Sequence, residues 1–459
     1  MTVVPQVPTD SKGTVALTTL GCARNDVDSD ELRARLVAEG WTVTDDETAA
    51  DVVVVNTCGF VASAKKDSID TVLQAADHAP VIVAGCMAER YGADLAAELP
   101  EAAAVIGFDA YERVSQIVSG VLDGQVIESH TPSDRRLLLP LTPVDRSIDG
   151  TPGTAGLART VDGPLVAVKL ASGCDRRCSF CAIPSFRGAF SSRRPSDVLH
   201  EVRQVVAQGA KEVLLVSENS TSYGKDLGDL RLLETLLSEI GQTPGLVRAR
   251  VNYLQPAEMR PSLEQVIAQT PGIAPYFDLS FQHAEPRVLR RMRRFGGIDD
   301  FLALLQRIRL LNPLAGARSN VIVGFPGETQ SDLDILADFI AEAGLDAIGV
   351  FGYSDEEGTE AVNLPDHLSE NEIADRVHHI SALVDECVLQ RAEDRVGEQI
   401  RVLIESIDEG IVGRAEHQGP EDSVTIVQGL GAGTQIGIGD TVVAVVTHTD
   451  GPDLVANVL

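Results

Sequence analysis

The sequence predicts a mixed α/β protein with an N-terminal doubly wound α/β domain, a central partial (βα)6 barrel and a small C-terminal β-barrel. Three observations predict this order. Val-rich apolar segments alternate with helical patterns before residue 130. Six further strand–helix units follow a Pro- and Gly-rich stretch, and residues 396–459 alternate apolar and polar positions. A chain of 459 residues fits about three domains.

The N-terminal domain is expected over residues 14–130. Its predicted strands are short, apolar and rich in Val, as buried parallel strands are: 14–20, 52–55 and 81–84. Helical patterns lie between them. Asp28 and Glu31 resemble an N-terminal capping pair that would open the helix DSDELRARLVAEG.

The central domain is expected over residues 161–395, after a linker at 131–160 whose Pro- and Gly-rich composition favours a loop or hairpin. Helical stretches separate its strands, and a helix is expected near 369–395. The predicted strands are 165–170, 212–217, 246–252, 276–282, 317–323 and 346–352. Strand–helix units in series predict a parallel sheet that curves into an incomplete barrel.

The last residues, 396–459, contain five short alternating segments separated by Gly-rich turns. This pattern predicts a small β-barrel of the oligonucleotide-binding type or a similar shape.

Composition restricts the class of protein. The net charge of −30 opposes binding to a nucleic-acid backbone and favours a basic partner. No apolar run approaches the ~18 residues of a membrane span, and the start MTVVPQVPTDSKG does not resemble a signal peptide. We therefore expect a cytoplasmic protein with no membrane partner. Its seven cysteines favour metal ligation or catalysis over disulfides.

Three of these cysteines form the pattern C-x₃-C-x₂-C directly after the first strand of the expected barrel: Cys174, Cys178 and Cys181. Thiolates select iron–sulfur clusters or zinc. Three thiolates around a [4Fe–4S] cluster leave one iron open for a substrate or cofactor. The alternative is zinc with a distant fourth ligand, for which His200 or His283 could serve.

Three more cysteines each follow an N-terminal strand: Cys22, Cys58 and Cys86. Parallel strands bring their carboxyl ends to one sheet edge, so these thiols are expected to converge and hold a second cluster. Three separate buried cysteines are the alternative. Cys387 has helical spacing with apolar neighbours and is expected to pack in a core.

The pattern C-x₃-C-x-aromatic-C, with Phe180 as the aromatic residue, resembles the radical S-adenosylmethionine (SAM) superfamily. The resemblance implies that the open iron binds SAM and that the reduced cluster cleaves it to a 5′-deoxyadenosyl radical. It also implies SAM contacts after the second strand, at Glu218 and Asn219, and at Gly324 in the turn VGFPGET. For each of these a plain polar loop or turn is the alternative. His283 is more often structural than catalytic, and no catalytic residue beyond the cluster ligands is identified.

The whole chain resembles the methylthiotransferases, which combine a three-cysteine N-terminal domain, a radical SAM barrel and a C-terminal TRAM barrel. The resemblance implies two [4Fe–4S] clusters, with SAM as radical source and methyl donor. Sulfur would be presented at the open iron of the second cluster and inserted into an unactivated C–H bond. An electron donor such as flavodoxin or ferredoxin would be needed, and a monomer is expected.

One branch of that family modifies the β-carbon of an aspartate in ribosomal protein S-twelve, and TLGCARNDVDSDEL and NTCGFVASAKKDSID resemble this branch. Residues 396–459 hold ten acidic residues against two basic ones, a balance of −8, which suits a basic ribosomal protein. The alternative is the branch that modifies (isopentenyl)adenosine in tRNA, which would need a basic surface from Arg187, Arg193, Arg194 and the Arg run at 287–294. A non-catalytic, zinc-containing ribosome-associated factor is the alternative from another class.

Overall fold

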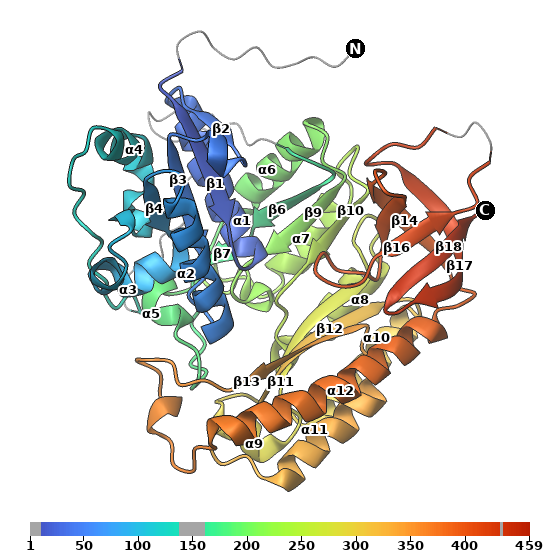
Figure 1. Cartoon of the computed structure of the whole chain (residues 1–459). Coiled ribbons are helices and arrows are strands. Elements are labelled where there is room, and N and C mark those ends of the chain that lie inside the picture. Colours follow the sequence, from blue (N-terminus) through green and yellow to red (C-terminus); the bar gives the residue numbers. More distant parts are fainter. Residues whose placement is uncertain (1–10, 137–160, 432–434) are drawn as a thin grey trace. The chain divides into compact units, whose positions relative to one another are not determined.

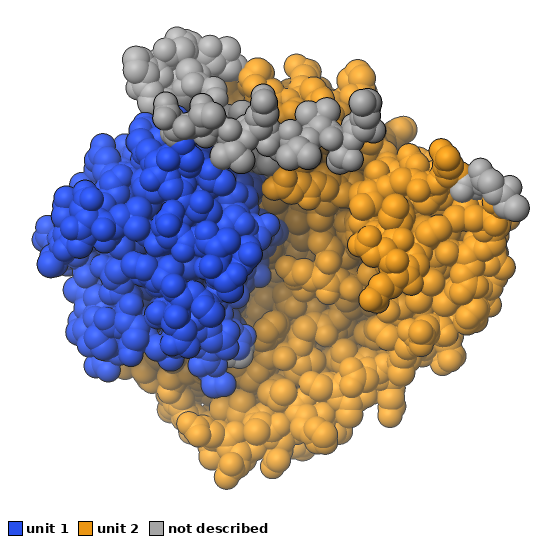
Figure 2. Space-filling model, turned by 45° about the horizontal axis from the view of Figure 1, so that its top comes forward, with its two compact units in different colours: residues 1–160, 172–175, 182–191 blue, residues 161–171, 176–181, 192–459 orange. Residues whose placement is uncertain are grey.

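The computed structural model describes residues 11–136, 161–431 and 435–459 (Figure 1). The chain forms two compact units, coloured separately in Figure 2. Unit 1 is Met1–Thr160 with Ser172–Asp175 and Ala182–Ser191, and unit 2 is Val161–Ala171 with Arg176–Cys181 and Ser192–Leu459. Of the expected linker, residues 137–160 lie outside the described residues. No helix in the described ranges is both long and apolar enough to cross a membrane.

Unit 1 is built on a parallel sheet in the order β2-β1-β3-β4-β5. Its strands are β1 (Thr14–Thr19), β2 (Thr42–Thr44), β3 (Val52–Thr57), β4 (Val81–Ala84) and β5 (Ala102–Val105). Its longer helices are α1 (Ala23–Ala38), α2 (Ala62–Ala76), α3 (Gly85–Glu98) and α4 (Val114–Leu122). One core lies between the sheet and α1 and α4, and the other lies between the sheet and α2 and α3. The predicted doubly wound fold is confirmed.

Two features of unit 1 differ from the prediction. The short strands β2 and β5 were not predicted. The helix α1 begins at Ala23 with Cys22 as its N-cap, five residues before the expected start. The capping role of Asp28 and Glu31 is therefore wrong, because both lie inside the helix. Glu31 instead accepts hydrogen bonds from the Arg35 guanidinium, one turn later, at 3.0 and 2.9 Å.

Unit 2 contains the six predicted central strands, each within two residues of its expected ends. They are β6 (Leu165–Lys169), β9 (Glu212–Val216), β10 (Arg248–Val251), β11 (Tyr276–Gln282), β12 (Gly316–Val323) and β13 (Ala347–Gly352). Two three-stranded sheets, β10-β9-β6 and β11-β12-β13, are joined by isolated parallel bridges, Ala249 with Ile273 just before β11 and Leu254 just after β10 with Leu279. This arrangement confirms the partial barrel.

Helices follow these strands along the chain, as βα units require. They are α6 (Pro195–Ala207), α7 (Leu232–Ile240), α8 (Pro261–Gln269), α9 (Pro286–Arg291), α10 (Ile298–Leu311), α11 (Gln330–Ala343) and α12 (Glu370–Asp394). The helix α12 matches the expected 369–395. It starts with a capping box in which Ser369 and Glu372 satisfy each other's backbone amides.

The C-terminal residues form a closed barrel in the order β14-β15-β16-β18-β17, as expected. Its strands are β14 (Gln399–Ser406), β15 (Ile411–Ala415), β16 (Thr425–Gln428), β17 (Thr441–Asp450) and β18 (Asp453–Val458). Alternate apolar side chains point inward and form its core, which includes Val402, Ile404, Val427, Val446 and Leu454.

The C-terminal barrel is joined to the central barrel by buried charged groups. Glu212 accepts hydrogen bonds from Arg248 at 2.6 Å and Arg250 at 2.9 Å. These arginines also donate to the carbonyls of Arg414 (3.0 Å) and Glu416 (2.9 Å) in the C-terminal barrel. Glu212 and Arg248 are the first residues of β9 and β10, so the C-terminal barrel covers amino ends of the central strands. The predicted site residues follow the opposite, carboxyl ends.

Candidate functional site

In unit 1, three cysteines lie directly after neighbouring strands. Cys22 caps α1 after β1, Cys58 follows β3, and Cys86 is the second residue of α3 after β4. Because β2 and β3 flank β1, the chain reverses its winding direction at β1, and such a switch point is where open α/β sheets bind ligands. The topology therefore brings the three thiols to the ligand-binding edge of the sheet.

The thiols are near enough to influence one another. The charge of Cys22 contributes to raising the pKa of both Cys58 and Cys86. Burial is the larger cause in each and raises the pKa of Cys86 to about 11, while Arg187 opposes this shift. An unassisted thiolate is therefore unfavourable here, and a bound metal would supply the missing positive charge. The soft donor set fits iron.

Asn25 fixes the position of two of these cysteines. Its side-chain amide donates to the carbonyl of Leu20 at 2.7 Å and to that of Thr57 at 3.1 Å. These carbonyls lie just before Cys22 and Cys58. The Asn25 side chain therefore ties the ends of β1 and β3 together.

The expectation that Arg187 lies on the surface was wrong. It was a candidate for a basic RNA-binding surface, but its side chain is only 8% exposed. Its Nη2 lies 2.9 Å from Cys86 Sγ, 2.8 Å from Asp28 Oδ2 and 3.2 Å from Asn25 Oδ1. Its guanidinium lies 4.3 Å from the centre of the Phe108 ring. Arg187 and Cys86 are 101 residues apart in sequence, so no local pattern signals the contact.

The second cysteine group lies on the loop that follows β6 and the short strand β7 (Ala171–Ser172). Cys174 belongs to unit 1, and Cys178 and Cys181 belong to unit 2. In unit 2 the backbone N–H of Cys181 donates to the carbonyl of Cys178 at 3.2 Å. The buried Arg294 has its Nη1 3.8 Å from Cys178 Sγ. A cationic side chain thus lies beside the sulfur of a predicted cluster ligand.

Phe180 anchors this loop in an apolar cluster. The half-buried ring packs against buried side chains from the helices and strand ends of unit 2, namely Val288, Met292, Phe325, Tyr353 and Ala361. The aromatic residue of the motif therefore contributes to apolar packing in this structure. Its predicted contact with SAM stays a prediction.

The two polar residues predicted after β9 differ in their environment. Glu218 is 9% exposed, and neither carboxylate oxygen has a hydrogen-bond partner in the described part of the chain. Asn219 donates through Nδ2 to Ser222 at 2.8 Å and Glu258 at 3.1 Å, and its Oδ1 accepts from Thr221. Buried acceptors normally have partners, so Glu218 fits a ligand with donor groups, whereas Asn219 holds the loop.

Two asparagines that the sequence did not single out share this property. Asn252 follows β10, Asn320 lies in β12, and the Oδ1 of each is buried with no hydrogen-bond partner among the described residues. Tyr253, directly after Asn252, has a positive φ of 62°, and Gln282, the last residue of β11, where the register is irregular, has a φ of 71°. Such backbone strain occurs mainly at functional sites. The pattern of apolar strands ending in Asn is the sequence signal that could have identified Asn252.

The turn VGFPGET is held by its own side chains. The amide of Gly324 donates to both oxygens of Glu328 at 3.0 Å, and a Cβ at Gly324 would lie 2.6 Å from Ile373 Cγ1. His283 is fully buried, with Nε2 3.4 Å from Glu328 Oε2, while its Nδ1 accepts from the Glu285 amide. The site role of Gly324 stays a prediction, and His283 has the structural environment that the sequence favoured.

No set of three His, Cys, Asp or Glu side chains in the described ranges is arranged to hold a metal ion. Of the two histidines considered for zinc, His283 is committed to Glu285 and Glu328, and His200 is exposed on α6.

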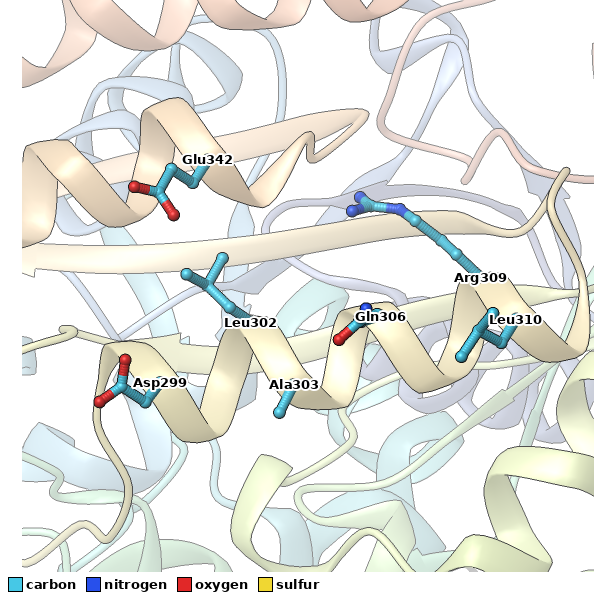
Figure 3. A pocket seen from close by; sticks show the side chains of 7 residues that line it. All are labelled: Asp299, Leu302, Ala303, Gln306, Arg309, Leu310 and Glu342. Carbon is cyan, nitrogen blue, oxygen red and sulfur yellow. The ribbon is translucent and has the colours of Figure 1, made fainter.

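A pocket of about 540 Å³ lies elsewhere, on the surface of α10 and α11 (Figure 3). It contains none of the predicted site residues. Its lining is Asp299, Leu302, Ala303, Gln306, Arg309, Leu310 and Glu342.

A six-stranded partial barrel with three cysteines on its first loop is the architecture of a radical SAM enzyme. Comparison with known proteins agrees. Residues 168–340 match the radical SAM superfamily, residues 14–107 match the uncharacterized protein family UPF0004, and residues 396–459 match the TRAM domain.

The most similar relatives share one name, ribosomal protein uS12 methylthiotransferase RimO. The protein from Saccharopolyspora erythraea is 58% identical, over 96% of this chain and 94% of the relative. The protein from Nocardioides sp. is 57% identical, and that from Streptomyces coelicolor 55%, each over 97% of both chains. The chain belongs to the RimO family of radical SAM methylthiotransferases.

Among solved structures, the radical SAM methyltransferase TsrM from Kitasatospora setae has a TM-score of 0.51, with 17% identity over 75% of each chain. At this identity the likeness concerns the fold alone.

Proposed function

We propose that this protein methylthiolates the β-carbon of an aspartate in ribosomal protein uS12 (S-twelve). The observation that carries the proposal is the placement of six cysteines at carboxyl ends of strands, in a chain 58% identical to a RimO enzyme along nearly its whole length. Carboxyl ends of parallel strands are where both kinds of α/β fold perform chemistry.

The protein is an iron–sulfur enzyme that uses SAM. When bound, the cluster and SAM supply the electron and the carbon radical that can remove hydrogen from an unactivated C–H bond. We assign the SAM-binding cluster to Cys174, Cys178 and Cys181. A second [4Fe–4S] cluster, which would present the sulfur, is assigned to Cys22, Cys58 and Cys86. We also propose domain boundaries near residues 130, 160 and 395. The first two separate the N-terminal cysteine set from the radical SAM cysteine set, and the third separates the central domain from the C-terminal barrel.

The residues of the central barrel would orient SAM. Glu218, Asn252 and Asn320 each offer a buried oxygen without a partner in the described part of the chain, and SAM carries ammonium and hydroxyl donors that need such acceptors. Asn219 supports Glu218 by fixing the loop between β9 and the helix after it. Phe180 keeps the cysteine loop in place through packing.

Charge supports a basic protein as substrate. The chain carries a net charge of −30, and exposed acids of the C-terminal barrel include Asp408, Glu409 and Asp450. Some other acids there are used internally: Glu405 pairs with Arg414, and Glu421 pairs with Arg318 at 2.9 Å. The acidic surface is therefore smaller than the balance of −8 indicates, but it is still acidic.

Several of the arginines that the tRNA alternative would need are already paired. Arg193 lies 2.7 Å from Glu201, and Arg293 lies 2.6 Å from Glu360. Arg187 is buried beside Cys86. A phosphate backbone requires exposed, available cations. We further propose a monomeric, cytoplasmic enzyme that receives electrons from a flavodoxin or ferredoxin.

An anaerobic competition tests the substrate. Reconstituted enzyme receives SAM, reductant and sulfide together with small ribosomal subunits and unmodified tRNA, and both are analysed by mass spectrometry for a methylthio group. Label on an aspartate of uS12 alone is expected. Label on tRNA alone would overturn the assignment of the substrate.

A pair of cysteine variants tests the assignment of the SAM cluster. Cys178→Ala should abolish reductive SAM cleavage, measured as 5′-deoxyadenosine formation, because two thiolates do not hold the cluster with one open iron. The matched control is Cys387→Ala, since Cys387 is half-buried on α12 and has no proposed ligand role. Cleavage that survives in Cys178→Ala at the wild-type rate would refute the assignment.

A further inference from the structure

Arg187 has contacts that go beyond those of a structural ion pair. We propose that Arg187 is a positioning residue for the second cluster. It holds Cys86 in place and, by hydrogen bonding to its sulfur, raises the reduction potential of the cluster there. This inference rests on the second cluster of the proposed function.

The geometry fixes Arg187 from several sides within unit 1. Its Nη2 lies 2.9 Å from Cys86 Sγ and 2.8 Å from Asp28 Oδ2. The Phe108 ring lies 4.3 Å below the guanidinium, and Asn25 Oδ1 lies 3.2 Å from the same nitrogen. All three acceptors lie around Nη2, whose two hydrogens they share. The planar guanidinium also packs over the Phe108 ring, which a lysine ammonium would not do in the same way.

Burial makes this contact strong. The side chains of Arg187 and Asp28 are 8% and 6% exposed. In such surroundings a charged hydrogen bond to a thiolate is screened little by water. Hydrogen bonds to cluster sulfurs withdraw electron density and help to set the reduction potential of iron–sulfur clusters. Asp28 keeps the guanidinium oriented, so the donor cannot turn away from Cys86.

The position of Arg187 in the sequence adds a connection between the two cysteine sets. It is the last residue of α5 (Ile183–Arg187) and lies six residues after Cys181. The segment that carries the radical SAM cysteines therefore also supplies the arginine that contacts Cys86. Arg187 therefore follows the radical SAM motif closely in sequence while its side chain contacts Cys86.

The test uses the full chain with Cys174, Cys178 and Cys181 all changed to Ala, so that only the second cluster can form. Into this parent we introduce Arg187→Met, Arg187→Lys or, as matched control, Arg135→Met. Arg135 is also buried in unit 1, where it pairs with Glu89 at 2.6 Å and with Asp109. Each variant is reconstituted anaerobically. Iron content, the rate of iron loss to a chelator and the midpoint potential by EPR-monitored titration are measured.

We expect Arg187→Met to lose iron about tenfold faster than the parent, the usual order for an outer-shell partner. We also expect a more negative midpoint potential, with partial recovery in Arg187→Lys and no change of potential in Arg135→Met. The single tryptophan, Trp41, is buried in unit 1, so its fluorescence reports whether that unit remains folded.

One outcome would contradict the role of Arg187, and another would contradict the second cluster. An unchanged potential and unchanged iron retention in a folded Arg187→Met variant would overturn the role of Arg187. A parent that binds no iron would instead overturn the second cluster itself, whatever Arg187 does.

Discussion

At the residue scale, Gly21 controls where the Cys58 thiol can lie. Its φ of 98° turns the chain from β1 into α1, and a Cβ at this position would lie 2.8 Å from Cys58 Cβ and 3.0 Å from Sγ. The positive φ and the closeness of Cys58 each exclude a side chain at this position. A residue other than glycine would have to move a proposed cluster ligand or the helix that begins at Cys22.

The variant Gly21→Ala should therefore lower the iron content of unit 1. Positive φ alone costs a non-glycine residue about 1–2 kcal/mol. The matched control is Gly124→Ala, because Gly124 has a φ of 70° and nothing within 4 Å of its Cβ position. Gly21→Ala should lose more stability in urea unfolding than Gly124→Ala, because it adds the clash with Cys58 to the cost of positive φ, and only Gly21→Ala should lose iron when the chain lacks the other three cluster cysteines. Equal iron content in both would show that Cys58 tolerates the displacement.

The sequence could predict the position of some residues of the candidate site but not of others. Cys22, Cys58 and Cys86 could be grouped because each ends a Val-rich strand and parallel strands share a carboxyl edge. Arg187 could not, because its contact with Cys86 depends on how α5 packs in unit 1. Asp28 was given a local capping role, yet its partner is this same distant arginine.

At the element scale, strong apolar periodicity was sufficient for the central strands, whose predicted ends differ from the observed ones by two residues or fewer. The strands β2 and β5 were missed for a physical reason. β2 has only three half-buried residues, and β5, AAAV, is rich in alanine, which has low strand propensity. Their places at the two edges of the sheet are decided by pairing with β1 and β4.

The joint between the central and C-terminal barrels depends on one buried carboxylate. Burial alone would raise the pKa of Glu212, but Arg248, Arg250 and Arg414 hold it well below its usual range. Glu212→Gln should cost about 3–5 kcal/mol at neutral pH, because it leaves buried guanidinium groups without their counter-charge. Urea unfolding followed by circular dichroism measures this loss.

The pH dependence has a definite sign. A carboxyl with a depressed folded-state pKa stabilises the fold above its unfolded pKa, here near 4.5, and this stabilisation is lost as the pH falls toward the folded value. The difference between wild type and Glu212→Gln should therefore shrink below pH 4.5. Glu421→Gln is the control, since this partner of Arg318 is 48% exposed and should cost less than about 1 kcal/mol. A pH-independent difference would mean that packing, not charge, holds the joint.

At the scale of the whole molecule, the sequence predicted the order of domains and the acidic character, but it overestimated how much acid is available to a partner. Charge counts treat every carboxylate alike. The structure shows that Glu212, Glu405 and Glu421 neutralise arginines within unit 2. The acids open to a basic substrate include those in exposed turns and strand ends of the C-terminal barrel, such as Asp408, Glu409 and Asp450.

This distinction gives a prediction about substrate binding. Long-range attraction between the acidic chain and basic uS12 should weaken as salt shortens the screening length to ~10 Å or less. The KM for ribosomal substrate should therefore rise several-fold from low to high NaCl, while SAM cleavage without substrate stays constant. A triple variant that neutralises exposed acids of the C-terminal barrel should start with a high KM and respond less to salt; its changes are Asp408→Asn, Glu409→Gln and Asp450→Asn.

The control must change the net charge equally at another place. Exposed acids on α11 provide it, through the changes Asp334→Asn, Asp338→Asn and Glu342→Gln. If the C-terminal barrel is the docking surface, only the first variant loses the salt response, because screening leaves each charge effective only over a short distance. If both variants show the same salt dependence of KM, the net charge of the chain drives association with the substrate, and the C-terminal barrel is not a specific docking surface. A KM that does not change with salt in the unmodified enzyme would contradict the electrostatic argument for a basic substrate altogether.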